Sequence, residues 1–239
     1  MKKYVIANWK ALPNSWAEAE GILDFLSENI SSAGDEVSLV ICPPFVYLEE
    51  VAKVFANTSL GSRAQLGVQD LTKESTAQTL NSINVRYVII GHSDRRWKLG
   101  ESNEVVNNKL KLALQYELTP IVCVGEKSRE GDFQKFIKDQ VEATFDGLTA
   151  AELEKCFIAY EPVWAISTNP GARPDTPDET RKALDVIRPL ISNSLILYGG
   201  SVNKNNSKDF LSMPEISGVL VGGASVRKEE FVEILRLAG

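Results

Sequence analysis

The sequence predicts an α/β fold in which eight strand-and-helix units form a closed parallel barrel, with an open doubly wound sheet as the alternative. First, short apolar segments alternate with longer amphipathic segments along the 239 residues. Second, several short segments are apolar throughout, as strands are when both faces of a parallel sheet are covered. Third, eight such units fit a barrel of about 250 residues. Because no linker or change in composition divides the chain, we expect one domain over residues 1–239.

The expected strands are short segments rich in apolar and β-branched residues. In chain order they are Tyr4–Ala7, Ser38–Cys42, Gln65–Val68, Tyr87–Ile90, Thr119–Val124, Phe157–Tyr160, Leu195–Tyr198 and Gly218–Val221. The segments between them carry apolar residues at helical spacing. The clearest of these are Ser15–Leu26, Glu104–Tyr116, Phe133–Phe145, Pro177–Ile191 and Lys228–Leu237. Thr176-Pro-Asp-Glu179 marks a helix start, because Thr is a good N-cap and Pro suits the first helical position.

Composition and charge exclude several classes of protein. The formal net charge of −6 argues against a nucleic-acid-binding surface. No apolar run approaches the ~20 residues of a membrane span, and Asn8 interrupts the apolar start that a signal peptide would need. Cys42, Cys123 and Cys156 stand in apolar segments, as buried reduced thiols do. We therefore expect a cytoplasmic protein with no nucleic-acid or membrane partner, and the single histidine, His92, excludes a histidine-based metal cluster.

Polar residues and glycine pairs follow most of the expected strands. In a parallel barrel the carboxyl ends of the strands meet at one face, so these residues converge there. They include Asn8-Trp-Lys10, Gly91-His92-Ser93, Gly125-Glu126, Tyr160-Glu161-Pro162, Tyr198-Gly-Gly-Ser201 and Val221-Gly-Gly223. This convergence is the strongest indication of an active site, and the two glycine pairs favour phosphate binding over simple tight turns.

Three titratable residues at these strand ends have a structural and a functional interpretation. Glu161 follows four apolar or aromatic residues, so a partly desolvated carboxylate there suits a base toward a carbon acid; a carboxylate paired with an arginine is the alternative. His92 fits either a site residue or a satisfied buried histidine. Lys10 fits an anionic substrate or a lysine at the surface. For the charged residues near Arg95 we expect a structural network that includes an Arg95–Glu126 ion pair.

The motifs Asn8-Trp-Lys10, Gly91-His-Ser93, Tyr160-Glu-Pro-Val-Trp-Ala-Ile166, Tyr198-Gly-Gly-Ser201 and Gly222-Gly223 together resemble those of the triosephosphate isomerase family. They occur in the family's order and at compatible spacing between Tyr4 and Leu235. The resemblance implies a single-domain (β/α)8 TIM barrel. It also implies an aldose–ketose isomerase of glycolysis and gluconeogenesis, which interconverts dihydroxyacetone phosphate and D-glyceraldehyde 3-phosphate through an enediolate without a metal or cofactor.

The resemblance also implies a role for each matching residue. Glu161 would be the base that moves a proton between the substrate carbons, and His92 the electrophile at the carbonyl oxygen. Lys10 would stabilise negative charge, and Asn8 would orient that end of the site. The expected phosphate-binding residues, which act through their backbone, are Ser167 in the lid that follows Glu161, Ser201, Gly222 and Gly223.

Two departures from the family concern the site itself. The family usually continues its lid with Gly-Thr-Gly, whereas this lid (residues 162–174) continues with Ser167-Thr-Asn-Pro-Gly-Ala-Arg-Pro174. We expect a working lid whose C-terminal hinge is rebuilt and whose Ser167 N–H still reaches the phosphate. The family usually has Glu where this chain has Asp94, so we expect an altered or water-mediated contact to Lys10.

Two further departures concern self-association. The segment Val68–Thr76 is several residues shorter than the family's long loop after strand three, which docks against the partner subunit. Ala11-Leu-Pro-Asn14 also differs from the family residues that face that loop. We therefore expect a monomer, or a weakened or rearranged homodimer. Lys10 would then be held by contacts within one chain, from Asp94 or from the shortened loop.

Other activities remain open from the sequence alone. The altered lid would suit an enzyme that leaks the intermediate by elimination to methylglyoxal. A barrel that binds a triose phosphate or a protein without turnover would not need Lys10, His92 and Glu161 together. A structural scaffold would leave the polar strand ends unexplained, and we find no motif for binding a flavin or nucleotide.

Overall fold

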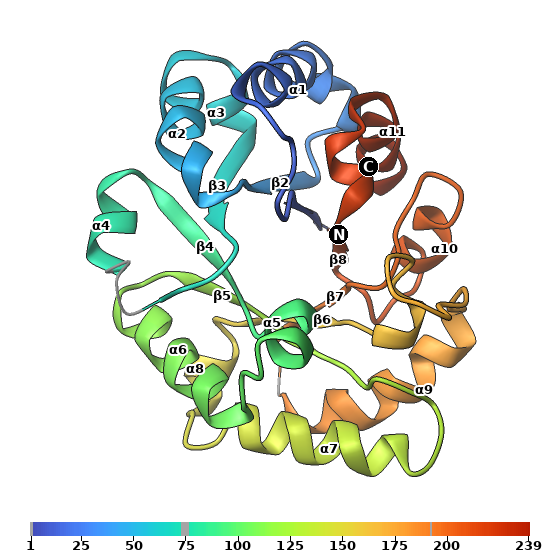
Figure 1. Cartoon of the computed structure of the whole chain (residues 1–239). Coiled ribbons are helices and arrows are strands. Elements are labelled where there is room, and N and C mark those ends of the chain that lie inside the picture. The colour runs from blue at the N-terminus through green and yellow to red at the C-terminus, as the bar shows by residue number, and fades with distance from the viewer. Residues whose placement is uncertain (1, 73–76, 192) are drawn as a thin grey trace.

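The chain folds as a closed barrel of parallel strands surrounded by helices (Figure 1). The computed structural model describes residues 2–72, 77–191 and 193–239. Each strand pairs with its neighbours in the order β1-β2-β3-β4-β5-β6-β7-β8. The first strand pairs with both the second and the last, with Tyr4 opposite Ser38 on one side and Gly218 on the other. This closure confirms the (β/α)8 barrel and excludes the open doubly wound sheet.

Every expected strand is present, and four of them extend by one or two residues beyond the expected ends. The strands are β1 Lys3–Asn8, β2 Val37–Cys42, β3 Ala64–Val68, β4 Val85–Ile90, β5 Thr119–Val124, β6 Phe157–Tyr160, β7 Leu195–Tyr198 and β8 Gly218–Val221. The extensions follow from pairing between neighbours, which lengthens a strand beyond its most apolar part.

The helices cover the outside of the barrel in the described residues. They are α1 Trp16–Asn29, α2 Leu48–Asn57, α3 Leu60–Arg63, α4 Ala77–Ser82, α5 Ser93–Lys98, α6 Asn103–Gln115, α7 Phe133–Thr144, α8 Ala150–Leu153, α9 Pro177–Ile187, α10 Ser207–Leu211 and α11 Lys228–Ala238. The expected helix at 177–191 ends as an α-helix at Ile187, and a 3₁₀ turn containing Pro189 follows it, because proline cannot supply the next helical N–H.

Side chains of each strand alternate between two apolar layers, which explains the continuously apolar strands. In β1, Ile6 points into the barrel, while Val5 and Ala7 pack against the surrounding helices. The barrel is closed near the amino ends of its strands by aromatic rings: Phe157 lies 4.7 Å from Tyr4 and 5.8 Å from Tyr87, measured between ring centroids. The carboxyl end of the barrel is thereby left for a site.

Several smaller expectations can be compared with the fold. Cys42, Cys123 and Cys156 are buried free thiols, as the sequence predicts. Within the described ranges, no helix combines the length and apolar character that crossing a membrane requires. The short connection expected after strand three includes residues 73–76, which lie outside the described residues. Its first part, from Gln69 to Thr72, lies between β3 and that gap.

Candidate active site

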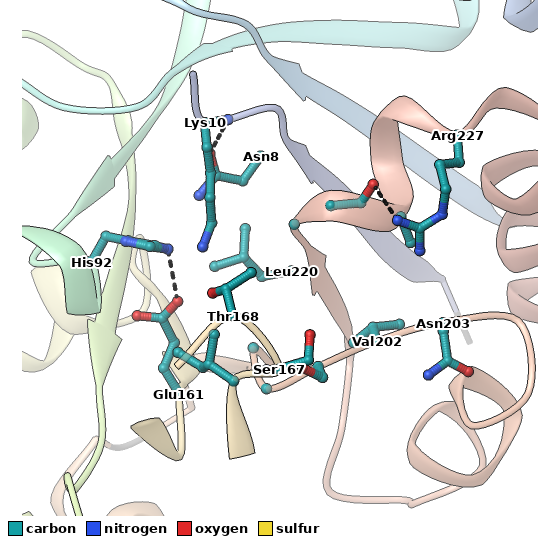
Figure 2. Close-up of a pocket in the computed structure, with 17 residues that line it drawn as sticks. Asn8, Lys10, His92, Glu161, Ser167, Thr168, Val202, Asn203, Leu220 and Arg227 are labelled. Carbon is teal, nitrogen blue, oxygen red and sulfur yellow. Dashed lines mark hydrogen bonds and ion pairs between the residues drawn. The ribbon is translucent and has the colours of Figure 1, made fainter. Parts of the chain in front are cut away.

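A cavity of about 220 Å³ opens at the carboxyl ends of the strands (Figure 2). All the residues that the sequence predicts for the site line this one cavity. They are Asn8, Lys10, His92, Glu161, Ser167, Ser201, Gly222 and Gly223. They come from the ends of β1, β4, β6, β7 and β8, so the closed barrel brings together segments separated by more than two hundred residues.

Glu161 follows β6 and is almost fully buried, with 3% of its surface exposed. Its backbone N–H donates to the Val124 carbonyl at 2.8 Å, which continues the ladder between β5 and β6. Its carboxylate accepts a hydrogen bond from the Ser93 N–H at 2.9 Å, and its Oε1 lies 3.2 Å from His92 Nε2. The carboxylate therefore faces the imidazole, and the alternative of a carboxylate paired with an arginine is wrong.

Glycines make room for this carboxylate. A Cβ on Gly199 would lie 2.9 Å from Glu161 Cγ, and one on Gly125 would lie 2.0 Å from the Glu161 carbonyl oxygen. A Cβ on Gly200 would lie 2.2 Å from the Tyr198 hydroxyl. The glycine pair after β7 therefore lets the chain approach Glu161 and Tyr198 closely, in addition to the phosphate role that the sequence favours.

His92 is the N-cap of α5, and this position defines its tautomer. Its Nδ1 accepts a hydrogen bond from the Asp94 N–H at 3.2 Å, so Nδ1 carries no proton. Burial lowers the pKa of the imidazole below its usual 6.5, while the Glu161 charge opposes this shift and the Lys10 charge supports it. The imidazole is therefore neutral at pH 7, with its Nε2–H pointing toward Glu161 and the cavity.

Lys10 follows β1 with a φ of 55°, in the left-handed region that favours glycine. Two contacts hold its backbone there: its N–H donates to Asn8 Oδ1 at 3.1 Å, and its carbonyl accepts from Gln69 Nε2 at 2.7 Å. Its ammonium lies 3.6 Å from Asp94 Oδ2. Contacts within one chain thus hold Lys10, as expected, and the Asp94 contact is a direct ion pair that needs no intervening water.

The phosphate-binding residues expected from the sequence gather at the other end of the cavity. The Ser167 N–H in the lid donates to Ser201 Oγ at 2.7 Å, so the lid touches the segment after β7. Among the described residues, the N–H groups of Ser201, Gly222 and Gly223 have no hydrogen-bond partner. Backbone donors left free around a cavity suit an anion.

The lid is anchored at both ends by charged and aromatic residues. Near its start, Trp164 donates from Nε1 to Glu126 Oε1 at 2.7 Å. Near its end, Arg173 forms two hydrogen bonds to Glu179, at 2.7 and 2.9 Å, and its guanidinium lies 4.1 Å from the centre of the Trp164 ring. The Arg173 N–H donates to the Trp164 carbonyl at 3.1 Å. The hinge thus has contacts of its own in place of the family's glycines.

One expectation about the charged residues is wrong. Arg95 does not pair with Glu126; it pairs with Asp70 at 2.9 Å and Glu101 at 2.6 Å. Glu126 instead pairs with Arg129 at 3.0 Å. The reason is the direction of α5, which turns Arg95 toward the segment after β3 and away from β5. Arg95 remains part of a structural network, as expected.

Other residues that contribute to the site are harder to identify from the sequence. Ser93 and Gln69, which hold Glu161 and Lys10, are adjacent to recognisable motifs but belong to common residue types. Thr168, Val202, Asn203, Leu220 and Arg227 also line the cavity. Among the described residues, no three His, Cys, Asp or Glu side chains gather as a metal site would require.

Comparison with known proteins gives a consistent similarity over the whole chain. A family model described as triosephosphate isomerase matches residues 3–238. The triosephosphate isomerase of Dictyoglomus turgidum is 40% identical, over 98% of this chain and 99% of the relative. That of Dehalococcoides mccartyi is 38% identical, over 100% of this chain and 97% of the relative. That of Nitrosococcus oceani is 36% identical, over 98% of both chains.

Proposed function

This chain belongs to the triosephosphate isomerase family, and on that premise we propose that Glu161, His92 and Lys10 carry out its interconversion of dihydroxyacetone phosphate and D-glyceraldehyde 3-phosphate. One observation carries the assignment of residues. A buried carboxylate and a neutral imidazole face each other at 3.2 Å in a cavity that an ammonium group also lines. A base next to a hydrogen-bond donor and a cation is what enolisation beside a carbonyl requires.

The proton transfer begins at the Glu161 carboxylate. Glu161 removes a proton from the substrate carbon beside the carbonyl, and negative charge develops on the carbonyl oxygen. The His92 Nε2–H donates a hydrogen bond to that oxygen, and the Lys10 ammonium lowers the energy of the enediolate by its charge. The hydroxyl proton of the enediolate passes to the former carbonyl oxygen by way of His92 Nε2, and Glu161 returns the carbon proton to the neighbouring carbon. Together these two transfers convert ketose to aldose or the reverse.

The phosphate anchors the substrate at the other end of the cavity. The free N–H groups of Ser201, Gly222 and Gly223 support this part of the proposal. The Ser167 N–H joins them when it exchanges its bond to Ser201 Oγ for one to a phosphate oxygen. Closing the lid over the enediolate excludes water and restrains the loss of phosphate that would give methylglyoxal. Asn8 helps to fix the carbonyl end by holding the Lys10 backbone.

Glu161→Gln tests the proposal, because it removes the base and keeps the shape of the side chain. We expect kcat in a coupled isomerase assay to fall by about 10²- to 10⁴-fold, with unchanged circular dichroism. Glu161→Asp keeps a carboxylate but moves it back by one methylene, so its kcat should fall less than that of Glu161→Gln. Glu142→Gln on α7, where a half-exposed carboxylate lies 3.7 Å from Lys138, is the matched control and should leave turnover unchanged. Wild-type turnover in a folded Glu161→Gln protein would remove Glu161 from the mechanism.

The wider setting of the enzyme is also part of the proposal. We propose that it acts in the cytoplasm, in glycolysis and gluconeogenesis, on a small triose phosphate and without a metal, cofactor, nucleic acid or membrane. Residues 1–239 would form one domain, which the continuous barrel supports. The enzyme would be a monomer or a weakened or rearranged homodimer. The sequence supports this last point, because the segment after β3 is shorter than the family's docking loop.

A further inference from the structure

We propose that Arg227 is a second cationic group of the substrate site, which binds the phosphate end of the triose phosphate. This inference rests on the proposed function and adds a residue outside the motifs that resemble the family. Arg227 directly precedes α11 and lines the same cavity as Lys10, Gly222 and Gly223. In Figure 2 it lies on the side of the cavity away from His92 and Glu161.

The position of the guanidinium is the first argument. Its Nη1 donates to the Gly223 carbonyl at 3.1 Å, and a Cβ on Gly223 would lie 3.7 Å from the same atom. Arg227 therefore packs beside the turn whose free N–H groups are the proposed phosphate donors. A phosphate held by the N–H groups of Gly222 and Gly223 would therefore share this part of the cavity with the positive charge.

The second argument is that one edge of the guanidinium is fixed and another is free. Arg227 Nε donates to Glu230 Oε2 at 2.5 Å, and Glu230 is held in turn by the Lys204 N–H at 3.3 Å. Nη2, by contrast, has no hydrogen-bond partner in the described part of the chain. The side chain is 58% exposed. An oriented guanidinium with a free N–H edge is suited to oxygens of a phosphate dianion.

The distribution of charge is the third argument. Among the described residues that line the cavity, the cationic side chains are Lys10 and Arg227, and the carboxylate is that of Glu161. The Lys10 ammonium lies 3.6 Å from Asp94. A Cβ on Gly222 would lie 4.0 Å from Lys10 Nζ, so Lys10 approaches the glycine turn from the side of the reacting carbons. Arg227 adds a second positive charge on the far side of this turn, so the two negative charges of the phosphate would lie between two cationic side chains.

A contact to the non-reacting end of the substrate has a characteristic kinetic effect. It binds substrate and transition state about equally, so its loss raises KM more than it lowers kcat. Loss of the contact should also weaken the binding of inorganic phosphate, which occupies only the phosphate end of the site. Because Arg227 is exposed and paired with Glu230, screening by solvent and salt keeps the effect moderate.

Arg227→Gln is the test, and Arg236→Gln is its matched control. Arg236 lies on α11, the helix that Arg227 precedes, and it pairs with Glu233 at 3.5 Å with the same three-residue spacing. It does not line the cavity. For Arg227→Gln we expect KM for triose phosphates and the inhibition constant of inorganic phosphate to rise about five- to tenfold, with kcat within about twofold. This difference should shrink as ionic strength rises. Arg236→Gln should change none of these quantities.

The inference is overturned if both variants show the same KM and the same inhibition constant for phosphate. Arg227→Lys keeps the charge and loses the planar guanidinium. Its KM and its inhibition constant for phosphate should therefore lie between those of wild type and Arg227→Gln. This variant also provides the test if Arg227→Gln does not fold. Calorimetric titration with inorganic phosphate separates this inference from the proposed function. If the wild-type protein does not isomerise triose phosphates, weaker phosphate binding in Arg227→Gln still supports Arg227, and unchanged binding still refutes it.

Discussion

At the scale of single residues, the chemistry of the site depends on which hydrogen-bond partner each side chain has. His92 shows this most clearly: by accepting the Asp94 N–H at Nδ1, it keeps the proton on Nε2, the nitrogen that faces Glu161. A protonated imidazole would have no lone pair for that bond. Local backbone geometry at the start of α5 therefore selects the form of His92 that can donate to a developing oxyanion.

The first prediction concerns the protonation of His92. Because burial lowers its pKa, the imidazole should titrate below pH 6.5 in the folded protein. As the chain has one histidine, its NMR signals are assigned without ambiguity. A measured pKa above 6.5 would contradict the downward shift that burial is expected to cause.

The same shift has a consequence for stability. A histidine with a lowered pKa in the folded state takes up its proton more readily in the unfolded state. Its contribution to stability is therefore fully present above about pH 6.5 and is lost as pH falls below that value, at up to about 1.4 kcal/mol per pH unit. The free energy of unfolding in urea should fall in this way for the wild-type protein as pH is lowered. In His92→Gln the part of the fall that is due to the histidine should be absent.

At the scale of elements, the lid is held by side-chain contacts near both of its ends. Its C-terminal hinge is held by Arg173, which binds the Glu179 carboxylate on α9 and lies over the Trp164 ring. The two ends of the lid are thereby joined through one guanidinium. Side-chain contacts thus restrict the hinge. The two prolines at 170 and 174 restrict its backbone further, because proline fixes φ, so we expect the hinge to move as a rigid unit.

We predict that Arg173→Met loosens the lid without unfolding the barrel. Methionine keeps the length of the side chain but loses the bonds to Glu179, so the lid should shield the enediolate less well. The ratio of methylglyoxal to isomerised product should rise about tenfold, since shielding by the lid is what restrains elimination. The measurement is a colorimetric assay of methylglyoxal alongside the coupled isomerase assay.

Arg181→Met is the control for this prediction. Arg181 lies on α9 and pairs with Asp178 at 3.0 Å and Glu215 at 3.3 Å, outside the lid. It should leave the product ratio at the wild-type value. If Arg173→Met gives the same ratio as this control, the anchoring of the lid does not depend on Arg173.

At the scale of the whole molecule, one network of ion pairs joins the segment after β3 to α5 and α6. Lys109 on α6 lies 2.7 Å from Asp70 and 2.6 Å from Glu101, and Arg95 on α5 contacts the same two carboxylates. Both carboxylates are nearly buried, so these cations compensate charges that would otherwise be costly. This part of the barrel is thus supported within one chain.

The remaining prediction is the oligomeric state. The segments after β1 and β2 expose apolar side chains, with Leu12 at 39%, Phe45 at 45% and Val46 at 81% exposure. We expect this surface to support at most a weak association, because the sequence predicts a shortened docking loop after β3. In sedimentation across a dilution series, the mass should fall to the 26.3 kDa monomer before nanomolar protein is reached. A dimer that persists at nanomolar concentration would refute the prediction, and Val46→Asp should abolish any association seen at high concentration.

By itself, the sequence determined where the strands lie along the chain and which strand ends carry polar residues, and its resemblance to the family implied the roles of Glu161, His92 and Lys10. The strands follow from local patterns, since apolar runs and the residues after them are set by neighbours along the chain. Only the tertiary structure decided that the barrel closes, that Arg95 pairs with Asp70 and Glu101, and that Arg227 faces the cavity. These outcomes depend on how segments far apart in the chain meet, and the packing of the whole barrel decides which side chains come into contact.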